Sequence, residues 1–294
     1  MDPADVVRRL GGIAGRHEVV DVVGRSALHR AVADGSLVRV ARGRYALPVT
    51  APARAAAQQL TGTAMLLSAA AHWGWALKAP PELPQVAVPR GRKVPDEARA
   101  LHDVRWRDVP AHHRVDGWVT SPVRTVHDCC ALLPFDEALC VVDSALRDHD
   151  TDLRGLHDLD DVPGRLRRRV GAVLDAGSEL AHGPFESVVR AVALGVPGLH
   201  VRPQVAIRDV DGFVGRVDLA DERLRIVIEA DSSEFHSGAA DFARDCERYS
   251  RLSVDGWLVV RVPWRMAMSE PDRLHRLLVR AVASRSRCTG CFAA

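Results

Sequence analysis

Residues 215–231 have the sequence Gly-Arg-Val-Asp-Leu-Ala-Asp-Glu-Arg-Leu-Arg-Ile-Val-Ile-Glu-Ala-Asp. The pattern predicts an apolar strand carrying Asp218, a polar turn, and a second apolar strand that ends in Glu229 and Asp231. Because side chains alternate along a strand, Glu229 and Asp231 are expected on the same face, and Asp218 lies beside them if the strands pair as a hairpin. Carboxylates gathered at strand ends repel one another and favour a hard cation. The segment therefore predicts a site for Mg²⁺ or Mn²⁺.

The segments around this hairpin predict a small α/β domain. Its expected elements, in order, are a helix over 184–194, strands over 201–207, 214–219 and 225–229, a helix over 241–254, a strand over 258–262 and a helix over 270–284. This α-β-β-β-α-β-α order predicts one domain over residues 183–285 and a flexible tail over 286–294.

That order, together with Glu186, Asp218, the Glu229-x-Asp231 pair and His236, resembles the PD-(D/E)XK endonuclease superfamily, and more narrowly its Vsr-like (very-short-patch repair) branch. The resemblance covers about residues 183–265. It implies a restriction-endonuclease-like αβββαβα domain that hydrolyses DNA phosphodiester bonds with Mg²⁺. It also implies that Glu186, Asp218, Glu229 and Asp231 are catalytic metal ligands and that His236 is a catalytic acid or base.

One departure from the family pattern bears on activity. The family's lysine is replaced by Asp231, and Ser232-Ser233 comes next where this branch usually has glycine. This favours either an altered metal geometry or a fold that was kept after activity was lost. Simpler interpretations stay open as well: Asp218 and Glu229 as solvated hairpin caps, Glu186 as an acid in a helix's first turn, and His236 as a surface histidine.

The expected helix over 241–254 carries a row of arginines. Arg244, Arg248 and Arg251 recur at helical spacing. They are predicted to hold the DNA backbone, because a guanidinium binds phosphate with two parallel hydrogen bonds. The alternative is an ordinary solvated helix face.

The N-terminal residues 1–48 predict a winged helix-turn-helix. Helices are expected over 3–10, with Asp2 as N-cap, over 17–23 and over 26–33, and strands after them at 37–41 and 44–47. Eight arginines against five acids give this segment a net charge of +3. The side chains expected to contact DNA are Arg25, His29, Arg30, Arg39, Arg42 and Arg44. A protein-interaction module is the alternative.

The first half of the chain carries a second resemblance. Residues 11–19 (GGIAGRHEV) and 37–48 (LVRVARGRYALP) resemble the N-terminal domain of AbiEi-type antitoxins. Residues 67–75 (LSAAAHWGW) and 120–128 (TSPVRTVHD) are similar to the segment that comes after this domain in actinobacterial relatives. The match spans about residues 5–147 and implies a regulator that binds promoter DNA, with a toxin or repair factor as a possible partner protein.

The middle region, residues 49–175, shows no catalytic constellation. His112-His113 suggests a metal ligand pair, but an exposed loop is the favoured interpretation. Cys129, Cys130 and Cys140 lie in apolar surroundings and are expected in the core, whereas Cys288 and Cys291 form a CxxC pair in the tail that is more typical of an incidental spacing than of a metal site.

Composition sets the broad class. The chain has 294 residues, 47% of them hydrophobic, and a net charge of +2. No secretory signal or membrane span is predicted, so a cytoplasmic protein is expected. The expected fold is mixed α/β, with a winged helix-turn-helix, a middle α/β region and a restriction-endonuclease-like domain.

Two functions fit these expectations. The first is a Mg²⁺-dependent endonuclease acting on double-stranded DNA. The second is a non-catalytic DNA-binding regulator or antitoxin with a degenerate nuclease-like domain. An adaptor with neither activity is a third possibility, and the sequence leaves the oligomeric state open.

Overall fold

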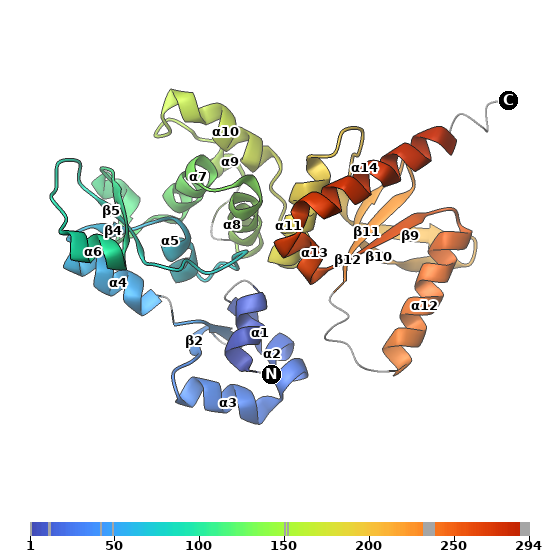
Figure 1. Cartoon of the computed structure of the whole chain (residues 1–294), viewed down its shortest axis with the longest axis horizontal. Coiled ribbons are helices and arrows are strands. Elements are labelled where there is room, and N and C mark those ends of the chain that lie inside the picture. The colour runs from blue at the N-terminus through green and yellow to red at the C-terminus, as the bar shows by residue number, and fades with distance from the viewer. Residues whose placement is uncertain are drawn as a thin grey trace. The chain divides into compact units, whose positions relative to one another are not determined.

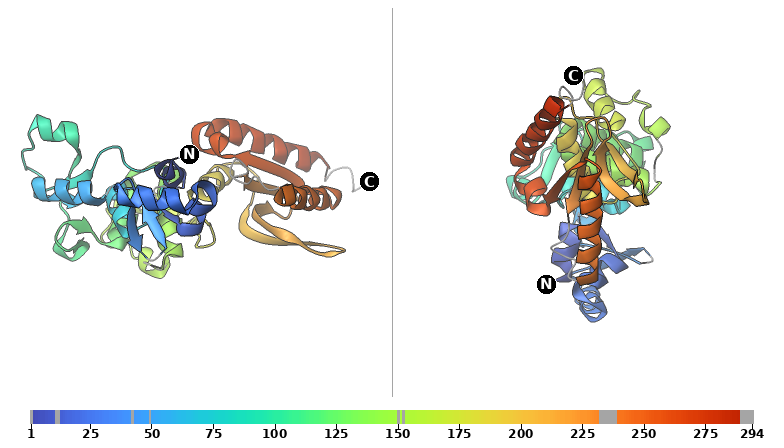
Figure 2. Two further views of the ribbon diagram at one scale, coloured as in Figure 1. Left: turned by 90° about the horizontal axis from the view of Figure 1, so that it is seen from below. Right: turned by 90° about the vertical axis from the view of Figure 1, so that its right-hand side faces the viewer.

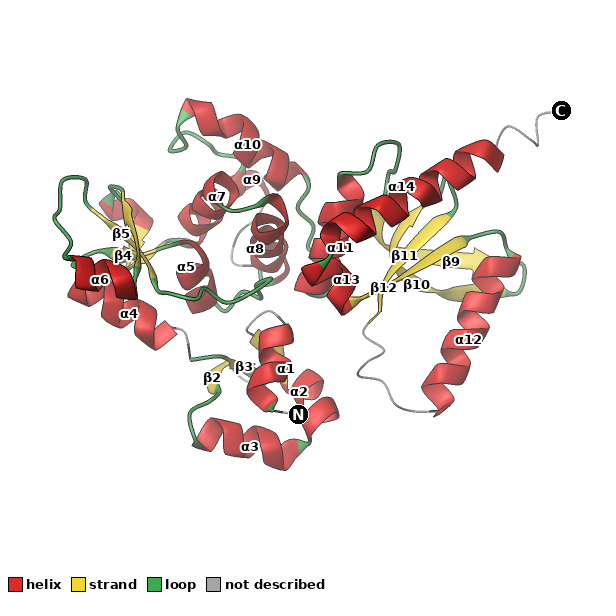
Figure 3. Ribbon diagram, in the orientation of Figure 1, coloured by secondary structure: helices red, strands yellow, loops and turns green. Residues whose placement is uncertain are grey.

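A computed structural model of the 294-residue chain forms two units, Met1–Glu179 and Leu180–Ala294 (Figure 1). It describes all residues except 1, 11–12, 42, 49, 150, 152, 232–238 and 289–294. The expected mixed α/β class is confirmed, since helices and strands alternate through both units (Figure 3). Among the described residues, no helix combines the length and apolar character needed to cross a membrane.

The N-terminal segment has the winged helix-turn-helix arrangement. Its elements are α1 (Pro3–Arg9), β1 (Ile13–Gly15), α2 (Arg16–Val23), α3 (Arg25–Ala33), β2 (Val38–Ala41) and β3 (Arg44–Ala46). Asp2 caps α1 as expected, because its carboxylate accepts from the Ala4 N–H at 3.0 Å. The strand β1 was not expected, and it completes an antiparallel sheet of order β1-β3-β2.

A separate core holds this segment together. Val7, Val19, Leu28 and Leu37 are almost fully buried and pack with Tyr45. Leu28 lies on the inner side of α3, so the outer side of that helix is available to solvent.

The middle region surrounds a five-stranded sheet of order β6-β5-β4-β8-β7. Its elements are α4 (Thr50–Gln59), β4 (Thr63–Ala64), α5 (Leu66–Trp73), β5 (Gln85–Val88), α6 (Asp96–Leu101), β6 (Asp103–Trp106), the 3₁₀ helix η1 (Ala111–His113), β7 (Arg114–Val115), β8 (Val119–Thr120), α7 (Pro122–Leu132), α8 (Phe135–Arg147), α9 (Leu153–Leu156) and α10 (Gly164–Asp175). The prediction that Cys129, Cys130 and Cys140 are core residues is confirmed, since all three are buried free thiols.

The second unit has the expected element order with one additional helix. Its elements are α11 (Pro184–Leu194), β9 (Arg202–Asp209), β10 (Gly212–Asp221), β11 (Ile226–Asp231), α12 (Ala239–Val254), β12 (Leu258–Pro263), α13 (Trp264–Ser269) and α14 (Pro271–Cys288). The tail was expected to begin at residue 286, but α14 continues to Cys288 because arginines in its last turn suit the carbonyl end of a helix.

The sheet of this unit has the order β12-β11-β10-β9. β9, β10 and β11 form an antiparallel meander that starts with a long hairpin (yellow-orange in Figure 2), and β12 pairs parallel to β11 after the crossover through α12. α12 packs against this sheet through Leu252, which joins Val217 and Val227 in one apolar cluster. This arrangement places the ends of β10 and β11 next to α12.

Candidate functional site

The helix α11 presents Glu186 from its first turn. Pro184 at the start of the helix suits the first helical position, where no backbone donor is needed. The Oε2 of Glu186 accepts from the backbone N–H of His182 and from Nε2 of Gln204, each at 3.1 Å. With 17% of its side chain exposed, Glu186 is held in a largely buried position.

Asp218 and Glu229 meet where β10 and β11 separate. The last paired position of the two strands is Leu219 with Ile228. One residue further, the backbone N–H of Asp218 donates to Oε2 of Glu229 at 3.1 Å, and the N–H of Ala230 donates to Oδ2 of Asp218 at 2.9 Å. The carboxylates thus accept from backbone donors beyond the last pair of β10 and β11, and the expected proximity of Asp218 and Glu229 is confirmed.

Gln204 connects the helix acid to the strand acid. Its Nε2 donates to Oε2 of Glu186 at 3.1 Å and to Oδ1 of Asp218 at 3.3 Å. Its backbone has a φ of +54° inside β9, where a residue other than glycine is strained by on the order of 1–3 kcal/mol. Sequence reasoning missed Gln204, since nothing in a single sequence marks a strand residue as left-handed.

The carboxyl groups of Glu186, Asp218 and Glu229 lie in an environment that disfavours their charged forms. Burial raises the pKa of Glu229 to about 7, the Asp218 charge adds to this effect, and Arg248 opposes it. Burial also raises the pKa of Glu186, with a further contribution from Asp218, and it raises the pKa of Asp218. Ionising all three groups together is costly without added positive charge, and a divalent cation is one source of that charge.

Glu229 already has a positively charged partner within the unit. Only 5% of Glu229 is exposed, and its Oε1 accepts from Nη1 of Arg248 on α12 at 2.6 Å. The guanidinium of Arg248 also lies 4.7 Å from the ring centre of Tyr249 and donates to the Tyr249 hydroxyl at 2.9 Å. Both oxygens of Glu229 are therefore engaged.

Asp231 pairs with an arginine of the neighbouring strand. Its Oδ2 lies 2.5 Å from Nη2 of Arg261 on β12. The Arg261 guanidinium lies 4.6 Å from the ring centre of Tyr249, so both arginines that contact the site acids stack on one tyrosine. His236, the expected acid or base, lies outside the described residues.

The four acids expected as one ligand set are thus distributed over different partners. Glu186 and Asp218 share Gln204, while Glu229 and Asp231 bind arginines. Across the described part of the chain, three metal-type ligand atoms lie within 4.8 Å of one another only at His112, His113 and Asp161, in the first unit.

The arginine row on α12 does not face solvent as one set. Arg244 is exposed, whereas Arg248 binds Glu229 and Arg251 forms two hydrogen bonds to Asp209, at 2.8 and 2.7 Å. Arg248 and Arg251 thus each pair with an acid of an adjacent strand, and contact of this row with the DNA backbone stays a prediction.

Four of the six winged-helix residues expected to contact DNA have described, exposed side chains. Arg25, His29 and Arg30 are exposed on α3, and Arg39 is exposed on β2. Arg44 belongs to β3, although its side chain is not described, and Arg42 lies outside the described residues. The exposed face of α3 is therefore basic.

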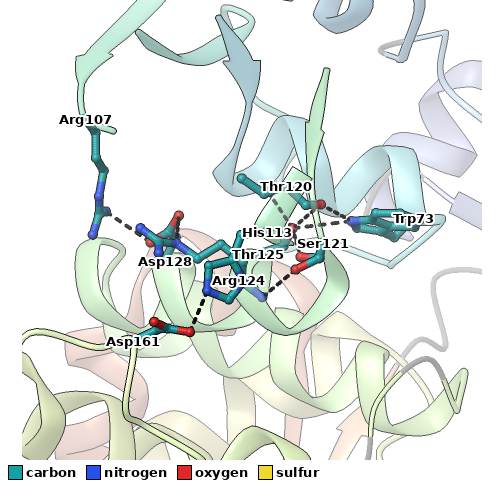
Figure 4. A network of polar contacts seen from close by, with 9 residues as sticks. All are labelled: Trp73, Arg107, His113, Thr120, Ser121, Arg124, Thr125, Asp128 and Asp161. Atoms are coloured by element: carbon teal, nitrogen blue, oxygen red, sulfur yellow. Dashed lines mark hydrogen bonds and ion pairs between the residues drawn. The ribbon is translucent and has the colours of Figure 1, made fainter. Parts of the chain in front are cut away.

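In the middle region, His113 is not a loop residue exposed to solvent. Only 9% of it is exposed, and its Nε2 lies 2.9 Å from Oδ2 of Asp161 (Figure 4). The expectation of an exposed loop is correct for His112, of whose side chain 66% is exposed, and wrong for His113. Packing against a segment 48 residues away could not be foreseen from the local sequence.

Comparison with known proteins gives no functional name. No family model matches the chain. The uncharacterized proteins Rv2248 and MT2308, from two strains of Mycobacterium tuberculosis, are each 31% identical to it over 185 residues. The match covers 60% of this chain and 66% of each relative, so the chain spans slightly less than two thirds of the curated relatives it matches.

One solved structure shows a distant likeness. The crystal structure of the RV2827C protein from Mycobacterium tuberculosis is 17% identical, with a TM-score of 0.34, and the match covers 65% of this chain and 78% of that one. A likeness at this level supports no conclusion about fold or function.

Proposed function

We propose that the second unit is a Mg²⁺-dependent DNA endonuclease domain of the PD-(D/E)XK type and that the winged helix binds double-stranded DNA for it. The observation that carries the proposal is the linkage of three buried acids, since Gln204 bridges Glu186 and Asp218 and the Asp218 N–H donates to Glu229. Burial raises the pKa of all three. Neighbouring buried carboxyl groups with raised pKa values are typical of functional sites.

The donor set fits a hard divalent cation. Glu186 and Asp218 offer carboxylate oxygens on either side of one amide, which is the ligand chemistry that Mg²⁺ prefers. A Mg²⁺ ion bound there would lower the pKa of water and polarise a phosphate oxygen. Gln204 orients the two acids, and the Glu229 carboxylate, by accepting from the Asp218 N–H, holds the strand end in place.

The winged helix would supply DNA affinity. The exposed face of α3 carries Arg25, His29 and Arg30, and a helix of this kind enters the major groove in DNA-binding winged helices. Because the charges are arginines, binding is expected to weaken steeply as salt concentration rises.

A second function is favoured by a different observation. Arg248 and Arg261 neutralise Glu229 and Asp231, so these acids are balanced without a metal. This supports a non-catalytic DNA-binding regulator in which the acid–arginine pairs serve only to stabilise the fold.

A cleavage assay separates the two functions. The full-length protein is incubated with supercoiled plasmid and duplex oligonucleotides in Mg²⁺, Mn²⁺ or EDTA. The endonuclease proposal expects nicking or cleavage with metal, abolished in Asp218→Asn, which keeps the side-chain shape. Glu222→Gln is the matched control. Glu222 is an acid that comes directly after the same strand, and 51% of its side chain is exposed. Cleavage that survives Asp218→Asn would show that the Asp218 site is not the source of the activity and would overturn the endonuclease proposal. Absence of cleavage in every condition would support the regulator.

A further inference from the structure

Two adjacent histidines and a distant aspartate converge in the middle region. His112 and His113 belong to η1, and Asp161 precedes α10. Nε2 of His113 lies 2.9 Å from Oδ2 of Asp161, and Nε2 of His112 lies 3.6 Å from the same oxygen. All three ligand atoms lie within 4.8 Å of one another. The site belongs to the first unit and does not depend on the proposed nuclease.

These separations are close to those of a tetrahedral zinc site. Zinc binds imidazole nitrogen and carboxylate oxygen at about 2.0–2.2 Å, which puts neighbouring ligand atoms of a tetrahedron roughly 3.3 Å apart. The two measured nitrogen–oxygen distances lie on either side of that value. The two histidine nitrogens lie within 4.8 Å of one another, so small side-chain rotations would be needed to bring the three atoms around one ion.

The arginines near Asp161 bind another acid, and the Asp161 carboxylate faces the two histidines. Arg107 and Arg124 line the same small cavity as Asp161, yet both bind Asp128, at 3.1 and 3.0 Å (Figure 4). A carboxylate beside two imidazoles is a donor set suited to zinc rather than to Mg²⁺.

We infer that His112, His113 and Asp161 form a zinc site with three protein ligands. His112 and Asp161 are exposed over 66% and 55% of their side chains, so the fourth position is open to water. The ion links η1 to the segment before α10, which are separated by 48 residues, and this cross-link stabilises the middle region.

The test measures zinc binding to the full-length chain. Cys288 and Cys291 are replaced by serine in every variant, so that the tail thiols cannot contribute. Zinc affinity is measured by competition with a chromophoric chelator, and the ligand field by Co²⁺ absorption. We expect one zinc per chain, with His112→Ala and Asp161→Asn each weakening binding by about tenfold or more. Both positions are exposed, so these variants are expected to fold, which circular dichroism checks.

A matched control identifies the site. His157→Ala removes another histidine of the same region, one paired with Asp175 at 3.0 Å, and is expected to leave zinc affinity unchanged. Zinc is also expected to raise the Tm of the parent and not that of His112→Ala. The inference is overturned if the parent binds no zinc at micromolar concentration, or if His112→Ala and Asp161→Asn bind as tightly as the parent.

Discussion

The backbone N–H of Asp218 donates to the carboxylate of Glu229 at 3.1 Å, one residue past the last paired position of β10 and β11. The two acids are therefore tied together by the geometry of the sheet end. Their mutual repulsion cannot be relieved by a small rotation of either side chain without leaving a backbone donor unsatisfied. This arrangement makes the site sensitive to pH, to cations and to the residues that hold it.

The first prediction concerns stability and pH. The pKa of Glu229 is raised by burial from an ordinary 4.5 to about 7. Between these values the unfolded chain loses a proton that the folded chain retains, so the contribution of Glu229 to the free energy of unfolding is greatest below about pH 4.5 and falls as the pH rises toward 7. Glu229→Gln removes this group, so its stability should fall less with pH than that of the parent. Urea denaturation across pH 4–8 measures the free energy of unfolding of the parent and of Glu229→Gln.

Added Mg²⁺ should flatten the pH dependence of the parent, because a bound cation stabilises the ionised carboxylates. The control is Glu222→Gln, whose curve should parallel that of the parent. Curves of Glu229→Gln and the parent that run parallel over the whole range would contradict the raised pKa.

The second prediction concerns the backbone of Gln204. Because its φ is +54°, glycine should fit this position better than alanine by about 1 kcal/mol, although both substitutions remove the amide that bridges Glu186 and Asp218. Thermal and urea unfolding should rank Gln204→Gly above Gln204→Ala in stability. The opposite order would show that the left-handed conformation is not retained.

The third prediction concerns Arg248. Replacing it with alanine leaves the buried Glu229 carboxylate without its guanidinium, which should cost about 2–3 kcal/mol of stability at pH 8. The loss should shrink at pH 5, where Glu229 is protonated. Arg244→Ala, one helical turn earlier on the exposed face of α12, should change stability by less than about 0.5 kcal/mol. Equal losses of stability in Arg248→Ala and Arg244→Ala would rule out a stabilising ion pair between Arg248 and Glu229.

The fourth prediction concerns DNA binding by the winged helix. Arg25→Ala and Arg30→Ala should each weaken duplex binding and lower the slope of log affinity against log salt by about one. Fluorescence anisotropy at several salt concentrations measures both quantities. Arg8→Ala is the control, because Arg8 lies on α1 and pairs with Asp5. Binding that is unchanged in both α3 variants would assign DNA contact to another surface.

The local sequence was sufficient for much of the second unit. The helix Pro184–Leu194 and the hairpin that joins Asp218 to Glu229 follow from helical spacing, strand alternation and a polar turn. These signals are local, since each depends on residues only a few positions apart. The same reasoning placed three cysteines in the core.

The composition of α7 does not mark it as a helix in the local sequence. It carries Arg124, His127 and Asp128 on a helix that is almost entirely buried. Buried polar residues remove the apolar periodicity that marks an ordinary amphipathic helix. Their burial is possible because partners from other segments, among them Arg107 and the carbonyl of Leu156, complete their hydrogen bonds.

The sequence by itself determined the order of the main elements of the second unit and which acids stand at its strand ends. Only the tertiary structure decided the partners: that Gln204 bridges Glu186 and Asp218, that Arg248 turns inward to Glu229, and that Asp161 meets two histidines. Each of these contacts joins segments separated by many residues. Whether a charge faces solvent, a cation or another side chain is settled by the packing of those segments, and the spacing of neighbours along the chain does not encode it.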